Sequence, residues 1–326
     1  MSRIPYFCPQ TGEPLDARPE GLRRADGRIY RFVCADHPNF LDLDQAGAGQ
    51  KASLAMYDTQ AAGEIYRNFL DWLFATFRVD EASFRRSLMT RLNPPLGGAV
   101  LITGCGLGDD IPAALDLVGA EGEVYAQDLS AAMVHEAHRR LSRDDPARAG
   151  RVFFSVGDAG RLPFADDALD AAYHFGGINL FDDIGQAIAE MNRVVRTGGR
   201  VVISDEGVGA WLRDTDFGRM VIANNRLWAH QPPIDRLPPT AADVSVSWIL
   251  GNCFWLIEFT VAADLPQIDP HVAHKGWRGG SMWTRHHGQL EAVTPETRAR
   301  VIQAAKTAGV SVHDWMEQAL AKAMDA

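Results

Sequence analysis

The sequence predicts an α/β fold in which a mostly parallel sheet is covered by helices on both faces. A small N-terminal module and a helical C-terminal tail are expected to flank it. Short apolar runs alternate with helical stretches between residues 99 and 204, which is the pattern of a doubly covered parallel sheet. Residues 1–45 carry turn signals and no long periodic segment. Two helical patterns with start and stop signals follow residue 293.

The composition limits the class of protein. The chain has 326 residues, of which 46% are hydrophobic and 23% charged, and its formal net charge is -10. This charge argues against a large nucleic-acid surface, which needs clustered lysines and arginines. No apolar run reaches the roughly 18 residues of a membrane span, and the first residues lack an apolar signal core. With only 4 scattered cysteines, we expect a reduced, cytoplasmic protein with no membrane span.

The N-terminal module is expected to span residues 1–45. Within it, the apolar run Ile29–Val33 follows an Asp-Gly turn and is interpreted as a strand. The stretch QAGAGQ at 45–50 has the composition of a linker. Helical spacing then runs from Ser53 to Leu92 and stops before a Pro-Pro pair. Its predicted apolar face consists of Ile65, Phe69, Trp72, Leu73 and Phe77.

The main domain is expected to span residues 46–293. Its predicted strands are Ala99–Thr103, Glu123–Gln127, Arg151–Val156, Ala168–Phe175 and Arg200–Ser204. Its predicted helices include Ile111–Val118, Ala131–Leu141 and Ile184–Val195. The aromatic run Trp248–Val261 and a further strand within Met282–Val293 are expected to form an antiparallel hairpin that closes an edge of the sheet.

Residues 205–247 interrupt the alternation and are interpreted as an insertion. They contain one helical piece, Asp216–Ala229, followed by a proline-rich stretch. An insertion after the fifth strand lies at the carboxyl edge of the sheet, where open α/β sheets bind ligands. We therefore expect the insertion to cover a substrate, and the alternative is a packing insertion without substrate contact.

The tail, residues 294–326, is predicted to form two helices. Thr294 can cap the first helix, with Pro295 at its first position and Gly309 at its end. Ser311 precedes the second helix. An apolar stripe along that helix is formed by Val312, Trp315, Met316, Ala319, Leu320 and Ala323.

A glycine-rich turn follows the first strand of the main domain. Gly104 permits a tight turn, and Gly106 and Gly108 allow close approach of a ligand to the backbone. A dinucleotide loop would need glycine where Asp109 stands. Asp109 and Asp110 would also repel a diphosphate at the start of the next helix. S-adenosylmethionine, which carries a sulfonium and an ammonium group and no phosphate, suits this turn better.

Carboxylates follow the next two strands. Asp128 ends the second strand, where a carboxylate can accept both hydroxyl groups of a ribose. Its alternative role is to cap the next helix, although Ser130 is better placed for that. Asp158 lies just past the third strand and can bond the exocyclic amine of an adenine, while Ala159 leaves room for the ring.

The motifs VLITGCGLG, VYAQDLS, GDAGRLPFADDALD and EMNRVVRTGGRVVIS occur in this order within residues 50–205. Together they resemble the class I S-adenosylmethionine-dependent methyltransferases, and most closely the branch of ubiquinone and menaquinone biosynthesis. The resemblance implies a Rossmann-like, seven-stranded sheet. It implies cofactor contacts from Gly104, Cys105, Gly106, Gly108, Asp128, Leu129, Asp158 and Ala159. The stretch MYDTQAAGEIY resembles the helix at the start of the family's domain and implies that Tyr57 and Tyr66 form a lid over the pocket.

Two positions of the main domain leave roles open. Family members commonly carry an acid where this chain has Ile102, so contact with the ammonium group of the cofactor is expected from Asp109, Asp110 or water. His174 ends the fourth strand and is the candidate catalytic residue, as a general base near neutral pH. It could equally be a neutral residue that touches the cofactor.

The N-terminal module resembles the small zinc-ribbon-like domain of certain ribosomal RNA guanine methyltransferases. One ligand pair is retained in Cys34-Ala-Asp-His37, but Thr11 stands where a partner of Cys8 belongs. A structural zinc site usually has four ligands. We therefore expect a metal-free module, and the alternative is zinc bound by Cys8, Cys34 and His37.

The tail resembles a ribbon-helix-helix module, with a short strand, a helix, a Gly-containing turn and a second helix. Its basic and acidic residues balance, so it lacks the charge that DNA binding needs. We expect it to pack or to join a homodimer. A segment between the main sheet and the tail is rich in tryptophan and histidine, including His271, His274, His286 and His287, and could line an acceptor pocket.

The sequence as a whole predicts methyl transfer from S-adenosylmethionine to a small, partly apolar acceptor by in-line displacement, for which the protein supplies alignment and a dry pocket. Two alternatives stay open. The first is a ribosomal RNA guanine methyltransferase, and the second is a non-catalytic regulator that senses S-adenosylmethionine and binds DNA through the tail. Small-molecule acceptors are favoured over nucleic acid as partners because of the negative charge.

Overall fold

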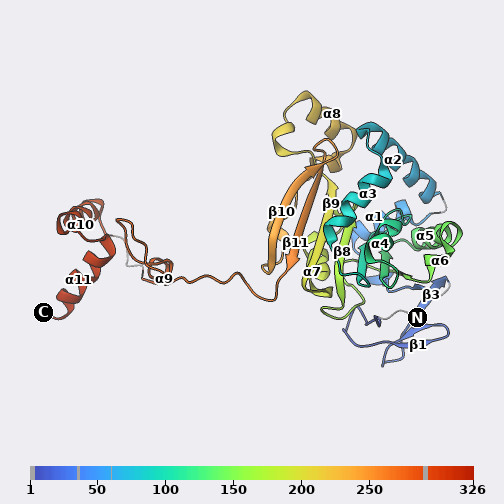
Figure 1. Ribbon diagram of the computed structural model, residues 1–326, viewed down its shortest axis with the longest axis horizontal. Coiled ribbons are helices and arrows are strands. Elements are labelled where there is room, and N and C mark those ends of the chain that lie inside the picture. Colours follow the sequence, from blue (N-terminus) through green and yellow to red (C-terminus); the bar gives the residue numbers. More distant parts are fainter. Residues whose placement is uncertain (1–3, 35–36, 60, 289–292) are drawn as a thin grey trace. The chain divides into compact units, whose positions relative to one another are not determined.

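The computed structural model describes residues 4–34, 37–59, 61–288 and 293–326 (Figure 1). The chain divides into two compact units, Met1–Leu265 and Pro266–Ala326. The boundary therefore lies earlier than residue 293, where the sequence placed the end of the main domain. The segment just after the boundary packs with the tail, because the amide of Val312 donates to the carbonyl of Trp277 at 3.0 Å.

The first unit is built on a seven-stranded sheet with the order β10-β11-β9-β8-β5-β6-β7. Its strands are β5 (Ala99–Thr103), β6 (Glu123–Asp128), β7 (Val152–Val156), β8 (Leu169–Phe175), β9 (Val195–Glu206), β10 (Ala241–Ile249) and β11 (Phe254–Val261). Neighbours from β9 to β7 run parallel, whereas β10 and β11 are antiparallel. The predicted α/β, Rossmann-like fold class is thereby confirmed.

Alternate residues of the central strand β5 enter two hydrophobic cores. Val100 and Ile102 join one core, and Ala99 and Leu101 join the other, because successive side chains of a strand point to opposite faces. The first core contains residues of α2 (Ala62–Phe77), α3 (Glu81–Met89), α4 (Ile111–Val118) and α5 (Ala131–Asp144), and the second contains residues of α7 (Ile184–Val194). The connections between these helices and the strands contain three short elements, η2 (Thr90–Leu92), α6 (Pro146–Ala149) and η3 (Ile178–Leu180).

The apolar stripe of α2 is rotated from the expected one. Ile65 and Trp72 are 64% and 41% exposed, whereas Leu70, Leu73 and Phe74 are buried. Leu70, Leu73 and Phe74 belong to the first core, and Ile65, Phe69, Leu70 and Leu73 line the cavity described below.

The antiparallel hairpin at the sheet edge was predicted, but its strands were misplaced. The run Trp248–Val261 is broken by a turn in which Leu250 and Asn252 adopt positive φ of 45° and 62°. The second strand is therefore β10, which begins inside the expected insertion. The strand expected within Met282–Val293 is wrong for its first part, where Ser281 caps the helix α9 (Met282–His287). Residues 289–292 lie outside the described residues.

The insertion is shorter than expected and mostly irregular. Its elements are η4 (Ala210–Leu212), α8 (Asp216–Asn224), η5 (Arg226–Ala229) and η6 (Ile234–Arg236). The predicted helix Asp216–Ala229 ends early because the Asn225 side chain accepts the amide of Leu227 at 3.0 Å and starts a new turn. Trp228 anchors the segment in the core at 2% exposure.

The N-terminal module is a four-stranded antiparallel sheet fused to the main domain. Its strands are β1 (Asp16–Arg18), β2 (Gly21–Arg23), β3 (Ile29–Cys34) and β4 (His37–Pro38), so the strand predicted over Ile29–Val33 is confirmed. After β4, the amide of Phe40 donates to the carbonyl of Val156 at the edge strand β7, at 2.8 Å. The expected linker at 45–50 instead runs from η1 (Leu43–Gln45) into α1 (Ala48–Tyr57).

The second unit contains α9, α10 (Pro295–Ala308) and α11 (Val312–Met324). Thr294 and Ser311 cap the last two helices, and Gly309 ends α10 with a positive φ of 69°, as predicted. The strand expected just before Thr294 falls largely on residues outside the described ranges. None of the described helices combines the length and apolar composition needed to cross a membrane.

Candidate active site

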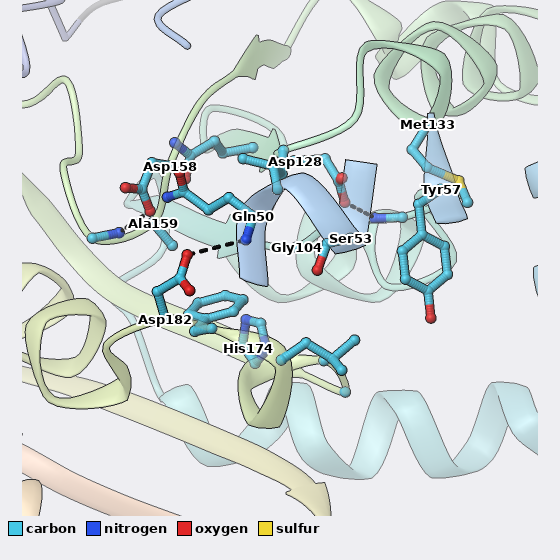
Figure 2. A pocket seen from close by; sticks show the side chains of 18 of the residues that line it. Gln50, Ser53, Tyr57, Gly104, Asp128, Met133, Asp158, Ala159, His174 and Asp182 are labelled. Atoms are coloured by element: carbon cyan, nitrogen blue, oxygen red, sulfur yellow. Dashed lines mark hydrogen bonds between the residues drawn. The ribbon is translucent and has the colours of Figure 1, made fainter. Parts of the chain in front are cut away.

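A cavity of about 960 Å³ opens at the carboxyl ends of the parallel strands (Figure 2). Its described lining residues all belong to the first unit. One wall combines the glycine-rich turn with residues after β6 and β7, and the opposite wall combines α1, α2 and the loops after β8 and β9. Eight of the residues predicted to contact the cofactor or close the pocket line this cavity: Tyr57, Tyr66, Gly104, Gly106, Asp128, Leu129, Asp158 and Ala159.

The glycine-rich turn leaves room at two points. Gly104 and Gly106 have positive φ of 61° and 50°, which favours glycine. A Cβ atom at Gly104 would lie 3.0 Å from Cε1 of His174, and one at Gly106 would lie 3.2 Å from Cε1 of Tyr66. Any other residue at these points would crowd the cavity wall.

Cys105 and Gly108 were expected at the cavity and do not line it. A Cβ atom at Gly108 would lie 3.2 Å from Cβ of Ala137 on α5, so this glycine serves packing of the turn against that helix. The Cys105 side chain is buried, and its amide donates to the carbonyl of Gln127 at 2.9 Å. It therefore ties the turn to β6.

Asp128 supports the turn and faces the cavity. Its carboxylate accepts the amide of Gly106 at 2.8 Å and that of Ser130 at 2.9 Å. Burial raises the pKa of this carboxyl group, although the backbone amides oppose the shift. Ser130 caps α5 through the amide of Met133, as the sequence favoured. A carboxylate has about four lone-pair sites, so Asp128 retains acceptor capacity for a ligand.

Asp109 and Asp110 do not reach the cavity, which corrects their expected role as contacts for an ammonium group. Asp110 pairs with the buried Arg85 at 2.8 Å, and Asp109 pairs with Arg140 at 2.9 Å. Asp110 makes no side-chain cap of α4 either. Burial raises the pKa of Asp110, and Arg85 opposes that shift. Arginines neutralise the charges of both carboxylates. The expected repulsion of a diphosphate by Asp109 and Asp110 is therefore no longer an argument against a diphosphate at this turn.

Helix α1 closes one side of the cavity, with the side chains of Gln50, Ser53 and Tyr57 along it (Figure 2). The rings of Tyr57 and Tyr66 meet edge to face at 6.2 Å. The carboxylate of Asp182, in the loop after η3, accepts the amides of Gly49 and Gln50 at 2.7 Å and 3.0 Å. This contact joins the start of α1 to the loop after β8.

Replacing Asp182 by alanine is expected to loosen α1. The amides of Gly49 and Gln50 would lose their acceptor and the first turn would lose a favourable negative charge. Hydrogen exchange at these two amides should accelerate at least fivefold. Asp183→Ala is the matched control, because Asp183 caps α7 through Gln186 and should leave α1 unchanged. Equal exchange in the two variants would show that Asp182 does not hold α1.

Gln127 and Phe40 line the cavity and were not singled out from the sequence. Gln127 is 1% exposed, and within the described chain neither polar atom of its amide has a hydrogen-bond partner. A buried amide without partners is costly, so this group indicates a polar ligand atom in the cavity. Its place at the carboxyl end of β6 was the available signal.

His174 lines the cavity, as its position at the end of β8 predicted. Its Nδ1 lies 3.0 Å from the Thr103 hydroxyl, and no described group bonds its buried Nε2 atom. Burial lowers the pKa of the imidazole, although the nearby Asp205 opposes the shift. The Nε2 atom of a neutral imidazole can accept a hydrogen bond from a ligand or donate one to it, depending on the tautomer.

A buried carboxyl pair ends β9 and was missed by the sequence reasoning. Asp205 accepts the amide of Asn179 at 2.6 Å, and Glu206 lines the cavity. Burial and the neighbouring Asp205 raise the pKa of Glu206 well above 4.5. The sequence signal was the Asp-Glu dipeptide at a strand end, which had been assigned to the start of the insertion.

The raised pKa of Glu206 makes stability depend on pH. Between pH 4.5 and the higher pKa of the folded state, the folded protein keeps a proton on Glu206 that the unfolded chain has lost. The stability that this protonation contributes is therefore complete below pH 4.5, and it is lost as pH rises through the folded pKa. The side chain of Glu206→Gln cannot titrate. The melting temperature of this variant should therefore rise relative to that of the wild type as pH increases from about 5 to 8. A difference that stays constant over that range would contradict the raised pKa.

The insertion contributes Asn225 and Leu227 to the cavity wall. The expectation that the insertion covers a substrate stays a prediction. The histidines and tryptophans expected near an acceptor, such as His271 and Trp283, belong to the second unit, where their rings contact each other at 5.5 Å.

Comparison with known proteins matches residues 100–199 to a family described as a methyltransferase domain. The demethylmenaquinone methyltransferase of Lactiplantibacillus plantarum is 30% identical over 157 residues, covering 45% of this chain and 64% of that protein. The O-methyltransferase cnsE of Penicillium expansum is 33% identical over 120 residues, covering 37% and 42%. The chain thus spans less than two thirds of the length of these curated relatives.

Among solved structures, phosphoethanolamine N-methyltransferase 2 of Haemonchus contortus, in complex with S-adenosyl-L-methionine, matches with a TM-score of 0.52. The identity is 14%, and the match covers 67% of this chain and 61% of that one. This likeness concerns the fold. The family match over residues 100–199 and the methyltransferase relatives support an S-adenosylmethionine-dependent methyltransferase domain in this chain, and the solved structure agrees with it in fold.

Proposed function

We propose that the protein transfers the methyl group of S-adenosylmethionine to a small, partly apolar acceptor. The observation that carries this proposal is one continuous cavity lined by two kinds of wall. The wall of Gly104, Asp128 and Asp158 suits the cofactor, and the remainder is largely aromatic and aliphatic. The relatedness to a demethylmenaquinone methyltransferase and an O-methyltransferase supports an acceptor of this kind.

The residues present fit S-adenosylmethionine. Asp128 would accept the ribose hydroxyls. Asp158 would accept the adenine amine, since among the described residues only one of its oxygens is engaged, by the amide of Gly160 at 2.8 Å. Gln127 offers polar atoms that have no partner among the described residues. When bound, the cofactor supplies an electrophilic methyl group on a sulfonium sulfur. Helix α1 and Tyr57 would exclude water from that group.

The acceptor would lie between α2 and the loops after β8 and β9. Phe69, Leu73, Leu227 and Phe254 line this part of the cavity, and Glu206 is its acidic group. His174 would hold or accept a proton near the acceptor atom, because its imidazole is buried and neutral. Quinone-like or phenolic molecules match such a lining, in which few polar groups fix orientation in an apolar pocket.

The proposal is tested by methyl transfer from labelled S-adenosylmethionine. Purified full-length protein is incubated with a panel of hydroxylated quinones and phenols, with total ribosomal RNA, and with duplex DNA, and products are identified by mass spectrometry. Labelling of small molecules that is lost in Asp128→Ala supports the proposal. Labelling of ribosomal RNA alone would overturn it in favour of an RNA methyltransferase, and sequence-selective duplex binding without any transfer would indicate a regulator.

We further propose that the tail joins two copies of the chain rather than binding DNA. Within the second unit, Leu320 and Met324 of α11 are 42% and 79% exposed. The tail also lacks a basic excess that would neutralise phosphates. Sedimentation of the full chain and of Leu320→Glu should give a dimer and a monomer. A wild-type monomer would reject this proposal.

A further inference from the structure

The N-terminal module and the main domain share a cluster of metal-ligand side chains away from the cavity. Cys34 ends β3, His37 begins β4, and His138 lies on α5. One ligand atom from each residue lies within 4.8 Å of the others. Cys8, which the sequence grouped with Cys34 and His37, is not part of this cluster, and its sulfur lies 3.2 Å from the Tyr30 hydroxyl.

The fold builds this cluster from three elements. An irregularity in the pairing of β3 with β4 sets Cys34 opposite His37. Just after β4, Asn39 bridges to Val156 at the edge of the main sheet, which holds the hairpin beside α5. His138 faces this hairpin from α5, and its ring meets that of His37 edge to face at 4.5 Å. Strand pairing therefore positions Cys34 and His37, and the packing of α5 against β3 positions His138.

The surroundings of the cluster suit a bound ion. His37 is 4% exposed, whereas Cys34 and His138 are partly accessible. The Phe154 ring lies 5.2 Å from the ring of His37 and 5.9 Å from that of His138, and provides an apolar floor. Such a site combines a protected floor with an open side through which an ion and a water ligand can enter.

The ligand chemistry restricts the ion. One thiolate and two imidazoles suit zinc, which is borderline-soft and tetrahedral, and these ligand types also bind copper. Hard cations such as magnesium prefer oxygen ligands. Bond lengths of about 2.0–2.3 Å place ligand atoms roughly 3.5 Å apart around one zinc ion. Side-chain rotations that move the sulfur and the two nitrogen atoms by about 1 Å would therefore bring all three to bonding distance of one ion.

We propose that Cys34, His37 and His138 bind one zinc ion that fastens the N-terminal module to α5, with water at the fourth position. Binding releases the thiol proton of Cys34 to solvent and leaves a thiolate–zinc bond. The site replaces the metal-free module expected from the sequence. It also differs from a self-contained ribbon, because one ligand comes from the main domain. The ion would hold against α5 a module that also contributes Phe40 to the cavity wall.

Zinc content tests the proposal directly. Full-length protein, purified without metal-affinity steps and reconstituted with zinc chloride, is dialysed and analysed by elemental mass spectrometry. The wild type should hold about one zinc ion per chain, and Cys34→Ser and His138→Gln should each lose most of it. His135→Gln and Cys8→Ser are matched controls, from the same helix and the same module, and should retain the ion.

Two further readouts separate binding from misfolding. Cobalt should give a thiolate-to-metal absorption band in the wild type that disappears in Cys34→Ser. Zinc should raise the melting temperature of the wild type and His135→Gln but not of His138→Gln, because only a ligand of the folded state stabilises it. A wild type that holds no zinc, or retention of zinc in both Cys34→Ser and His138→Gln, would overturn the proposal. Loss of zinc in Cys8→Ser alone would also overturn it, in favour of the ligand set within the module.

Discussion

Asp128→Ala is expected to weaken binding of S-adenosylmethionine by roughly two to four orders of magnitude, because two charge-assisted hydrogen bonds of about 1.5–3 kcal/mol each would be lost. Those bonds are the ones proposed from the carboxylate to the ribose hydroxyls. The substitution also removes the acceptor of the Gly106 amide, so the glycine-rich turn loses a support. Titration calorimetry of the purified variant measures the effect.

A second substitution separates the two roles of Asp128. Asp128→Asn keeps one amide oxygen, which can still accept a backbone amide, but removes the charge. We expect its affinity to lie between those of the wild type and Asp128→Ala. Asp116→Asn, at an exposed carboxylate of α4 that pairs with Arg148, is the control and should bind normally. Unchanged affinity in a folded Asp128→Ala protein would refute the ribose assignment.

Arg85→Met is expected to lower the free energy of unfolding by about 3–5 kcal/mol, the usual result of leaving a buried charge without its partner. Arg85 and Asp110 are 5% and 8% exposed, and Arg85 also bonds Glu81 at 2.8 Å. Its guanidinium lies 5.7 Å from the rings of both Phe74 and Phe175. Urea unfolding monitored by circular dichroism measures the loss.

The matched controls for Arg85 test whether the buried charge is the cause. Arg85→Met combined with Asp110→Leu should recover much of the loss, because an apolar pair can replace a buried ion pair. Glu81 would keep its contact with Arg67 at 2.6 Å. Arg139→Met breaks an exposed pair with Glu136 and should change stability little. If the double variant is no more stable than Arg85→Met, the loss comes from packing and not from the unpaired Asp110.

Local sequence pattern was sufficient for the framework of the site. The strand β5 and the helix α4 have the predicted bounds, Ala99–Thr103 and Ile111–Val118, because their apolar periodicity and their glycine boundaries agree. Asp128 and Asp158 reach the cavity because each follows a parallel strand, and the carboxyl ends of parallel strands share one edge. The strands of the edge hairpin were predicted less accurately, because a continuous apolar run does not show where the turn between two strands lies.

The sequence by itself determined the α/β class, the glycine-rich turn, and the carboxylates at the strand ends, all of which depend on spacing within short segments. Only the tertiary structure decided which partners the charged and metal-ligand side chains meet. Asp109 and Asp110 lie 31 and 25 residues from the arginines that bind them, and His138 joins Cys34 and His37 across an even longer separation. No local periodicity encodes such pairs, because they form only when distant elements pack together.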